Sequence, residues 1–242
     1  VPEMVAGIER ARDLHHTLTS DTDQVELELR LGVINSDSAT GFTAGVTAAA
    51  FARVEKRLDT GRDWARVEEW SNSRCFFHKR TSDDARVRTE ATVSNNSEHQ
   101  VHSQIKNRIG RYDWLINPGL SGPWLAIRLD INHEQQLRPS DDLTASVLPH
   151  AVHLKQRKSY YYCPTGQTTP VWCYSLTKRW IGATLEDVLG AKASSEPAYE
   201  IELECTDPTY LMTTETASVA YKTLSKIGDL LGLIEPKLSK TP

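Results

Sequence analysis

The sequence predicts a mainly β protein in which an antiparallel sheet or barrel is accompanied by a few helices. Between residues 67 and 181 it contains a series of short strand-like segments, separated by turn clusters such as Ser82-Asp83-Asp84 and Pro164-Thr165-Gly166. Charged and apolar residues alternate along several of these segments, so that each strand would have one charged and one apolar face. With 242 residues, of which 39% are hydrophobic and 25% charged, the chain can bury a substantial core, and we expect one domain over residues 1–242.

Helices are expected at both ends of the chain and at two places between the strands. Pro2 to about Leu18 has a proline in its first turn and a single apolar stripe. A second helix runs from a Thr47 cap to Leu58, and a short one is expected near residues 180–190. Asp207-Pro208 signals another helix start, followed by an apolar stripe that ends at Gly232. Residues 35–45, rich in Ser, Thr, Asp and Gly, are expected to form a loop.

The expected strands follow from the alternation and from the turn clusters between them. They are Val25–Gly32, Val67–Ser71, Arg74–Lys79, Ala85–Val93, Val101–Ile109, Trp124–Glu134, His150–Cys163, Val171–Trp180 and Tyr199–Cys205.

Two of these strands carry rows of glutamates. Glu200, Glu202 and Glu204 alternate with apolar residues and therefore share one face of the last strand, about 7 Å apart. Glu26 and Glu28 form a similar row near the start of the chain. The carboxylates in such a row repel one another unless cations lie among them. In a closed sheet the two strands could face each other, which suggests one metal site.

The strands between them carry mostly basic rows, including Arg86 with Arg88 and Lys155 with Arg157. One interpretation is that these faces simply meet water, as one side of many antiparallel sheets does. The alternative is that acidic and basic strands face each other across a barrel, which suits a metal–polyphosphate substrate because carboxylates bind the metal and Arg or Lys binds phosphate. The segregation of the two signs along the sequence favours the second interpretation.

Val25–Gly32 taken together with Tyr199–Glu204 resembles the paired signature of the triphosphate tunnel metalloenzymes. Within these the chain is most similar to the mRNA-capping RNA 5′-triphosphatases of fungi and protozoa, in a compact form like the trypanosomatid enzymes. The resemblance covers roughly residues 25–204. It implies an eight-stranded antiparallel β-barrel tunnel, with charged side chains inward and helices packed outside.

The resemblance also implies a role for each candidate site residue. The metal, Mg²⁺ or Mn²⁺, would be bound by Glu26, Glu28 and Glu204. Glu134 would activate water, and the other candidate catalytic residues are Arg86, Lys106, Arg128, Lys155 and Arg157, of which Arg86, Lys106, Lys155 and Arg157 would also bind substrate. The substrate site would be completed by Arg88, His153, Thr177, Glu200 and Glu202.

The sequence departs from the family pattern at three positions on two strands. His153 stands where the first member of a three-residue basic row is usually arginine. Cys173 and Ser175 replace a charged pair on the strand that retains Thr177. We therefore expect less charge in the tunnel than the family pattern implies.

The implied activity is removal of the γ-phosphate from a 5′-triphosphate end of RNA, the first step of capping, in the nucleus and with a capping guanylyltransferase as a partner. One alternative is hydrolysis of inorganic triphosphate or nucleoside triphosphates on the same fold. A non-catalytic barrel that binds a polyanion is an alternative of another class. The net charge of −4 argues against a broadly basic nucleic-acid surface, and no apolar run approaches the about 18 residues that span a membrane.

Overall fold

The computed structural model describes residues 2–17, 23–34, 41–79, 86–94, 97–116, 124–137 and 148–234. Its strands are β1 (Asp23–Ile34), β2 (Phe42–Ala44), β3 (Trp64–Lys79), β4 (Arg86–Ser94), β5 (Ser97–Ile116), β6 (Trp124–Leu137), β7 (Ala151–Tyr162), β8 (Trp172–Gly182) and β9 (Ala198–Cys205). Its helices are α1 (Pro2–Thr17), α2 (Ala48–Asp59), α3 (Leu185–Ser194), α4 (Pro208–Thr213) and α5 (Thr216–Ile234).

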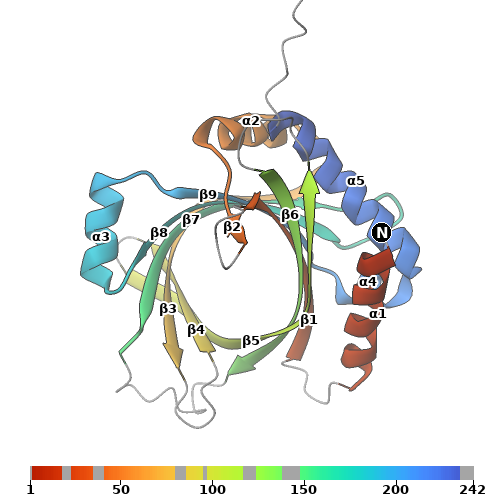
Figure 1. Ribbon diagram of the computed structural model, residues 1–242, viewed down its shortest axis with the longest axis horizontal. Coiled ribbons are helices and arrows are strands. Elements are labelled where there is room, and N and C mark those ends of the chain that lie inside the picture. The colour runs from red at the N-terminus through yellow and green to blue at the C-terminus, as the bar shows by residue number, and fades with distance from the viewer. Residues whose placement is uncertain are drawn as a thin grey trace, which may run out of the picture.

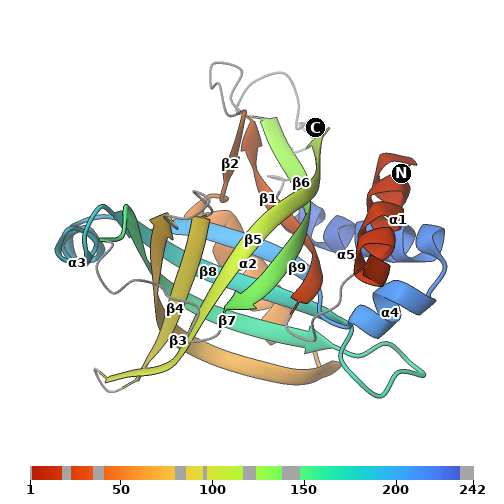
Figure 2. The same cartoon turned by 90° about the horizontal axis from the view of Figure 1, so that it is seen from below.

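Eight strands close into an antiparallel barrel, which Figure 1 shows end-on and Figure 2 from the side. The order around the barrel is β1-β6-β5-β4-β3-β7-β8-β9, and β9 returns to pair with β1. The short strand β2 pairs with the end of β1 and lies outside this closed ring. The eight-stranded barrel implied by the family resemblance is therefore confirmed.

The alternation in the strands separates a charged interior from an apolar outer surface. On β1, Leu27, Leu29 and Leu31 are fully buried on the outside of the barrel, whereas Glu26 and Glu28 point into it. The outward residues of β6, β8 and β9 extend the same apolar layer. Burying this layer requires a second layer over the barrel, because an apolar strand face is stable only when it is covered.

Helices supply that cover, and they lie outside the barrel on two sides (Figure 1). Helix α1 packs on β1, β5 and β6, while α2 and α5 pack on each other and α2 also contacts β9. Helix α3 covers β7 and β8 over a separate small core that contains Val152, Trp180 and Val188. Within the described residues, no helix is both long enough and apolar enough to cross a membrane.

Most helix boundaries agree with the expected ones. Thr47 caps α2 by accepting a hydrogen bond from the Ala50 backbone N–H at 3.2 Å, and Asp207 caps α4 in the same way. The prediction that the last helix ends at Gly232 is wrong, because α5 continues to Ile234, which is buried in the core. Apolar contacts at Ile234 thus extend the helix past the glycine.

Three other expectations about the strands need correction or fall outside the described residues. Val67–Ser71 and Arg74–Lys79 belong to one strand, β3, because its pairing with β7 continues without a shift through the two residues between them, Asn72 and Ser73. Residues Phe42–Ala44, expected in a loop, form β2. Of the two turn clusters named above, Pro164–Gly166 is a turn in which Gly166 has a φ of 86°, and Ser82–Asp84 lies outside the described residues.

Gly32 provides a test of the β1–β2 pairing. A Cβ at this position would overlap the Thr43 carbonyl oxygen and would lie 2.6 Å from the Phe42 ring, so Gly32→Ala must push β2 away. We expect a loss of about 1–3 kcal/mol in the free energy of unfolding, measured by denaturant melts. Gly190→Ala is the control, because Gly190 lies in α3 with no atom within 4 Å of the added methyl, and it should be neutral or slightly stabilising. Equal effects of the two substitutions would contradict the tight pairing.

Candidate active site

The interior of the barrel contains a cavity of about 450 Å³. Most of its lining side chains are charged, and they come from all eight strands of the barrel. The lining residues are Glu26, Glu28, Arg30, Phe77, Arg86, Arg88, Lys106, Arg108, Arg111, Asp130, Asn132, Glu134, His153, Lys155, Arg157, Arg179, Glu200, Glu202 and Glu204. The inward faces expected from the alternation therefore meet in one place.

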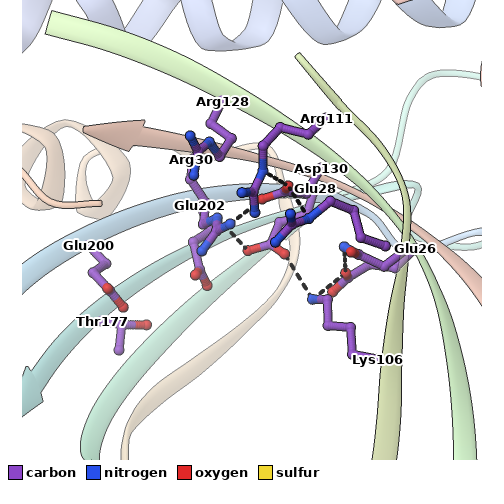
Figure 3. A network of polar contacts seen from close by, with 12 residues as sticks. Glu26, Glu28, Arg30, Lys106, Arg111, Arg128, Asp130, Thr177, Glu200 and Glu202 are labelled. Atoms are coloured by element: carbon purple, nitrogen blue, oxygen red, sulfur yellow. Dashed lines mark hydrogen bonds and ion pairs between the residues drawn. The ribbon is translucent and has the colours of Figure 1, made fainter. Parts of the chain in front are cut away.

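The predicted metal ligands lie on two directly paired strands. Glu28 on β1 stands opposite Glu204 on β9, and Glu26 is two residues further along β1. The Lys106 ammonium on β5 contacts the carboxylates of Glu26 and, at 3.0 Å, Glu28, as Figure 3 shows. It also lies 3.5 Å from Glu134, so one lysine lies between carboxylates from β1 and β6.

Burial and mutual repulsion shift the pKa values of these carboxyls in different directions. Burial, followed by the charge of Glu28, raises the pKa of Glu26 well above its usual range and that of Glu204 to about 7. Burial alone would also raise the pKa of Glu28, but Lys106 and Arg30 lower it to about 2. Glu26 and Glu204 therefore hold a proton more readily than ordinary glutamates, and a cation bound between them would stabilise their ionised forms.

The donor set fits a small divalent metal. Carboxylate oxygens are the ligands that Mg²⁺ and Mn²⁺ prefer, and Glu26, Glu28 and Glu204 supply them from adjacent strands. In the described part of the chain, however, no three acidic, histidine or cysteine side chains converge on a metal-binding point. We attribute this to Lys106, whose ammonium contacts Glu26 and Glu28 directly.

Glu134 faces the same end of the cavity and is held by neighbouring side chains. Its carboxylate accepts a hydrogen bond of 2.8 Å from the Gln104 amide. The neighbouring inward residue on β6, Asn132, donates at 2.9 Å to Glu26. Glu134 is thus fixed beside the acidic cluster, within reach of a water molecule or a phosphate in the cavity.

Two basic residues of β7 extend across the interior and are paired on both sides. Arg157 donates to the Thr177 hydroxyl at 3.0 Å and to Glu202 at 2.8 Å. Lys155, only 8% exposed, lies 3.6 Å from Glu90. Burial alone would raise the pKa of Glu90, but the positive charges of Lys155 and Arg88 outweigh it and lower this pKa to about 2.

His153, which stands where the family has arginine, is buried and uncharged near neutral pH. Burial and then the charges of Arg179 and Lys155 lower its pKa to about 3. Its ring packs against Phe77 with 4.5 Å between ring centroids. His153 can therefore offer a hydrogen bond to a substrate but adds no positive charge to the cavity.

Arg128 is the one predicted catalytic residue that the structure places away from the cavity lining. Its guanidinium donates two hydrogen bonds, of 2.7 and 2.8 Å, to Asp113 on β5. The Phe42 ring of β2 lies 4.2 Å below it. Arg128 and Glu134 are at different levels of β6, and in this arrangement Arg128 supports the end of the barrel.

Three uncharged residues of β8 are completely or almost completely buried beside the cavity rather than lining it. Thr177 accepts the hydrogen bond from Arg157 and thereby orients this guanidinium. Ser175 lies 3.6 Å from the thiol of Cys173 and 3.3 Å from the hydroxyl of Ser159 on β7. The neutral contacts of Cys173 and Ser175 agree with the expectation that this strand adds less charge to the tunnel.

The sequence-based prediction missed several lining residues, among them Arg179 at the other end of β8. Arg179 lies on the same face of β8 as Cys173, Ser175 and Thr177, because alternate residues of a strand share a face. Its guanidinium forms an ion pair with Glu200 at 2.6 Å. The Asp130 carboxylate accepts a hydrogen bond of 2.7 Å from the Arg111 guanidinium and contacts Arg30 directly. The alternation already places Arg30 on the strand face of Glu28, and Asp130 and Asn132 on that of Glu134; in the same way it would have placed Arg179 on the face of Thr177.

Charge is also divided along the axis of the barrel. Five arginines lie toward the end where β1 and β8 finish and β4 begins, and they outnumber the two carboxylates with which they pair there, Asp130 and Glu200. We call this end the basic mouth, after its arginines Arg30, Arg86, Arg108, Arg111 and Arg179. The acidic end consists of Glu26, Glu134 and Glu204, near the start of β1 and the finish of β6 and β9. Glu26 and Arg30 are about 13 Å apart along β1. A polyanion would therefore be drawn in through the basic mouth.

Solved structures with a similar fold include an RNA triphosphatase and the RNA triphosphatase domain of an mRNA-capping enzyme. The S. pombe Pct1 RNA triphosphatase superposes with a TM-score of 0.60 at 15% identity, covering 95% of this chain and 92% of that chain. The RNA triphosphatase domain of a mimivirus capping enzyme gives 0.56 at 15% identity, covering 94% and 95%. This chain has the RNA triphosphatase fold. No family model and no curated protein matches its sequence.

The likeness in fold extends over nearly the whole chain. Pct1 has also been crystallised in complex with the Spt5 CTD, with a TM-score of 0.59 to this chain at 16% identity, covering 95% of this chain and 93% of that one. At these identities the likeness concerns the backbone, and the chemistry of the cavity depends on the side chains described above.

The lowered pKa of Glu90 predicts acid sensitivity. A carboxyl with a folded pKa of about 2, against an ordinary 4.5, stabilises the fold above the ordinary value and loses this contribution as the pH falls toward 2. Glu90→Gln should lower stability at pH 7, and its difference from the wild type should shrink between pH 4.5 and 2. Thermal melts across this range measure it. Glu9→Gln, on the exposed face of α1, is the control, and a constant difference for Glu90→Gln would contradict the assignment.

Proposed function

We propose that this protein is a metal-dependent RNA 5′-triphosphatase that releases the γ-phosphate of a triphosphate-ended RNA. The observation that carries this proposal is the juxtaposition of Glu26, Glu28 and Glu204 with a wall of Arg and Lys inside one closed barrel. A barrel that only bound polyanions would gain nothing from this acidic cluster, which repels phosphate. The likeness to capping RNA triphosphatases supports the same reaction.

In this proposal the basic side chains bind the triphosphate and stabilise the charge that develops on it. Arg88 and Arg157 present guanidinium groups, each of which can bind two phosphate oxygens, and Lys155 supplies a further positive charge. Arg157 is already oriented by Thr177 and Glu202, so little rearrangement is needed when phosphate binds.

Glu26, Glu28 and Glu204 would hold Mg²⁺ or Mn²⁺. When bound, the ion supplies Lewis-acid polarisation of the γ-phosphate oxygens. Lys106 would then exchange its contacts with Glu26 and Glu28 for contacts with a phosphate oxygen, which keeps its charge compensated.

Glu134 would orient the attacking water in line with the leaving diphosphate. It lies beside the acidic cluster and is fixed by Gln104 through one carboxylate oxygen, so its other oxygen can accept a hydrogen bond from water. The product would be a diphosphate-ended RNA, which a guanylyltransferase can cap. A role in capping would bring the protein to nascent RNA in the nucleus.

The decisive experiment compares γ-phosphate release from triphosphate-ended RNA, ATP and inorganic triphosphate, each with Mg²⁺, Mn²⁺ or EDTA. We expect metal-dependent release from RNA and none in EDTA. Hydrolysis of inorganic triphosphate or ATP but not RNA would assign the alternative small-molecule activity. Tight binding of all three substrates without turnover would show a binding barrel instead.

Isosteric substitutions test the acidic cluster. Glu28→Gln and Glu204→Gln should each reduce kcat/KM for RNA by at least about 10²-fold, comparable to losing one strong transition-state contact. The double variant should lose little more, because residues that act as a unit are not additive. Mn²⁺ should raise the Tm of the wild type more than that of either variant. Glu68→Gln, exposed on β3 and outside the cavity, is the matched control, and equal losses at all three positions would exclude a specific cluster.

A further inference from the structure

We propose that Phe77 and Arg86 form a stacking site for the first base of the RNA at the basic mouth of the cavity. This inference rests on the proposed function and extends it to the nucleoside that carries the triphosphate. It identifies the ligand as a planar nucleobase and explains how RNA or a nucleotide would be distinguished from inorganic triphosphate.

Phe77 is unusual among the residues that line the cavity. In the described part of the chain it is the one hydrophobic side chain of the lining, and it is only partly buried. Its neighbour Phe76 points to the outside of the barrel and packs on the small core beneath α3. Core packing therefore accounts for Phe76 but not for Phe77, whose ring lies among charged groups.

The contacts of Phe77 resemble those of a base-stacking site. The Arg86 guanidinium carbon lies 4.4 Å from the centre of the Phe77 ring. The His153 ring lies on β7 with its centroid 4.5 Å away and is almost fully buried, so it supports Phe77 from within the barrel wall. Arg86 is exposed. Nucleobases stack well on aromatic rings and on arginine planes, and this pair provides both.

The position of the pair suits a base whose triphosphate lies deeper in the cavity. Phe77 is near the end of β3, where it pairs with Ala151 at the start of β7, and Arg86 is the first residue of β4. Both lie at the basic mouth, on the opposite side of the cavity from the acidic end. Phosphates drawn toward Lys106 and toward a metal ion held by the acidic cluster would leave the attached nucleoside at the mouth, beside Phe77.

A second explanation is that Phe77 only shields His153 from water. In that case its removal would disturb the pocket wall and would weaken the binding of every triphosphate to a similar extent. A stacking site makes a different prediction, because inorganic triphosphate has no base to stack. The ratio between substrates therefore separates the two explanations.

The test compares Phe77→Leu, Phe77→Trp and the control Phe76→Leu on RNA, ATP and inorganic triphosphate. Stacking on an aromatic side chain changes affinity by about tenfold or more per base. Phe77→Leu should therefore raise KM for RNA and ATP about tenfold more than for inorganic triphosphate, and Phe77→Trp should restore the wild-type ratio. Phe76→Leu should lower the Tm without changing that ratio.

Binding is measured separately with a triphosphate-ended dinucleotide whose first base is 2-aminopurine, in EDTA. Wild-type protein should quench its fluorescence on binding, whereas Phe77→Leu should not. Quenching without γ-phosphate release from RNA would overturn the proposed function but leave the base site standing. Metal-dependent release with equal effects of Phe77→Leu on all substrates, or no quenching by the wild type, would overturn the base site alone.

Discussion

The barrel depends on the compensation of opposite charges in its interior. An isolated buried charge is strongly unfavourable, so each must lie against a partner. Lys106 contacts Glu26 and Glu28, Arg157 contacts Glu202, and Arg179 contacts Glu200. Because these partners come from different strands, pairing of the charges and closure of the barrel reinforce each other. When a phosphate chain and its metal ion bind, phosphate oxygens can replace carboxylates as partners of Lys and Arg, and the metal ion can replace Lys as the partner of the carboxylates. The interior can therefore accept a highly charged ligand while each buried charge keeps a partner of opposite sign.

The likeness to the Pct1 RNA triphosphatase covers almost the whole chain although only 15% of the residues are identical. Alternation explains how both facts can hold. A strand of this barrel needs an apolar outer face and a polar inner face, and many residues satisfy each requirement. Leu27, Leu29 and Leu31 on β1 could be exchanged for other large apolar residues without changing the register. The inner face is more restricted, because there each side chain must match the charge of a neighbour across the strand pair.

Much of this arrangement could be predicted from the sequence. The alternation placed Glu26, Glu28, Glu204, Lys155 and Arg157 on the charged faces of their strands, and the family resemblance implied that these faces point inward. The structure brings all five into one cavity. Alternation does not say how far along the barrel a residue lies, because that depends on register and on strand tilt. The division into a basic mouth and an acidic end was therefore not predictable. The position of Arg128 was missed for a similar reason: β2 supplies Phe42 beneath it, and nothing in the loop-like composition of residues 35–45 signals a strand.

The direct pairing of β1 with β9 has a consequence for how the protein folds. These strands lie at opposite ends of the sequence, so joining them requires closing a loop of almost the entire barrel. Contacts of such long sequence separation form slowly and late in folding. Glu28 and Glu204 stand opposite each other in the pairing of β1 with β9, so they come together only when these two strands pair. A partly folded chain with every other strand in place would therefore still have its acidic cluster split in two. The candidate site comes into existence in the same step that completes the barrel.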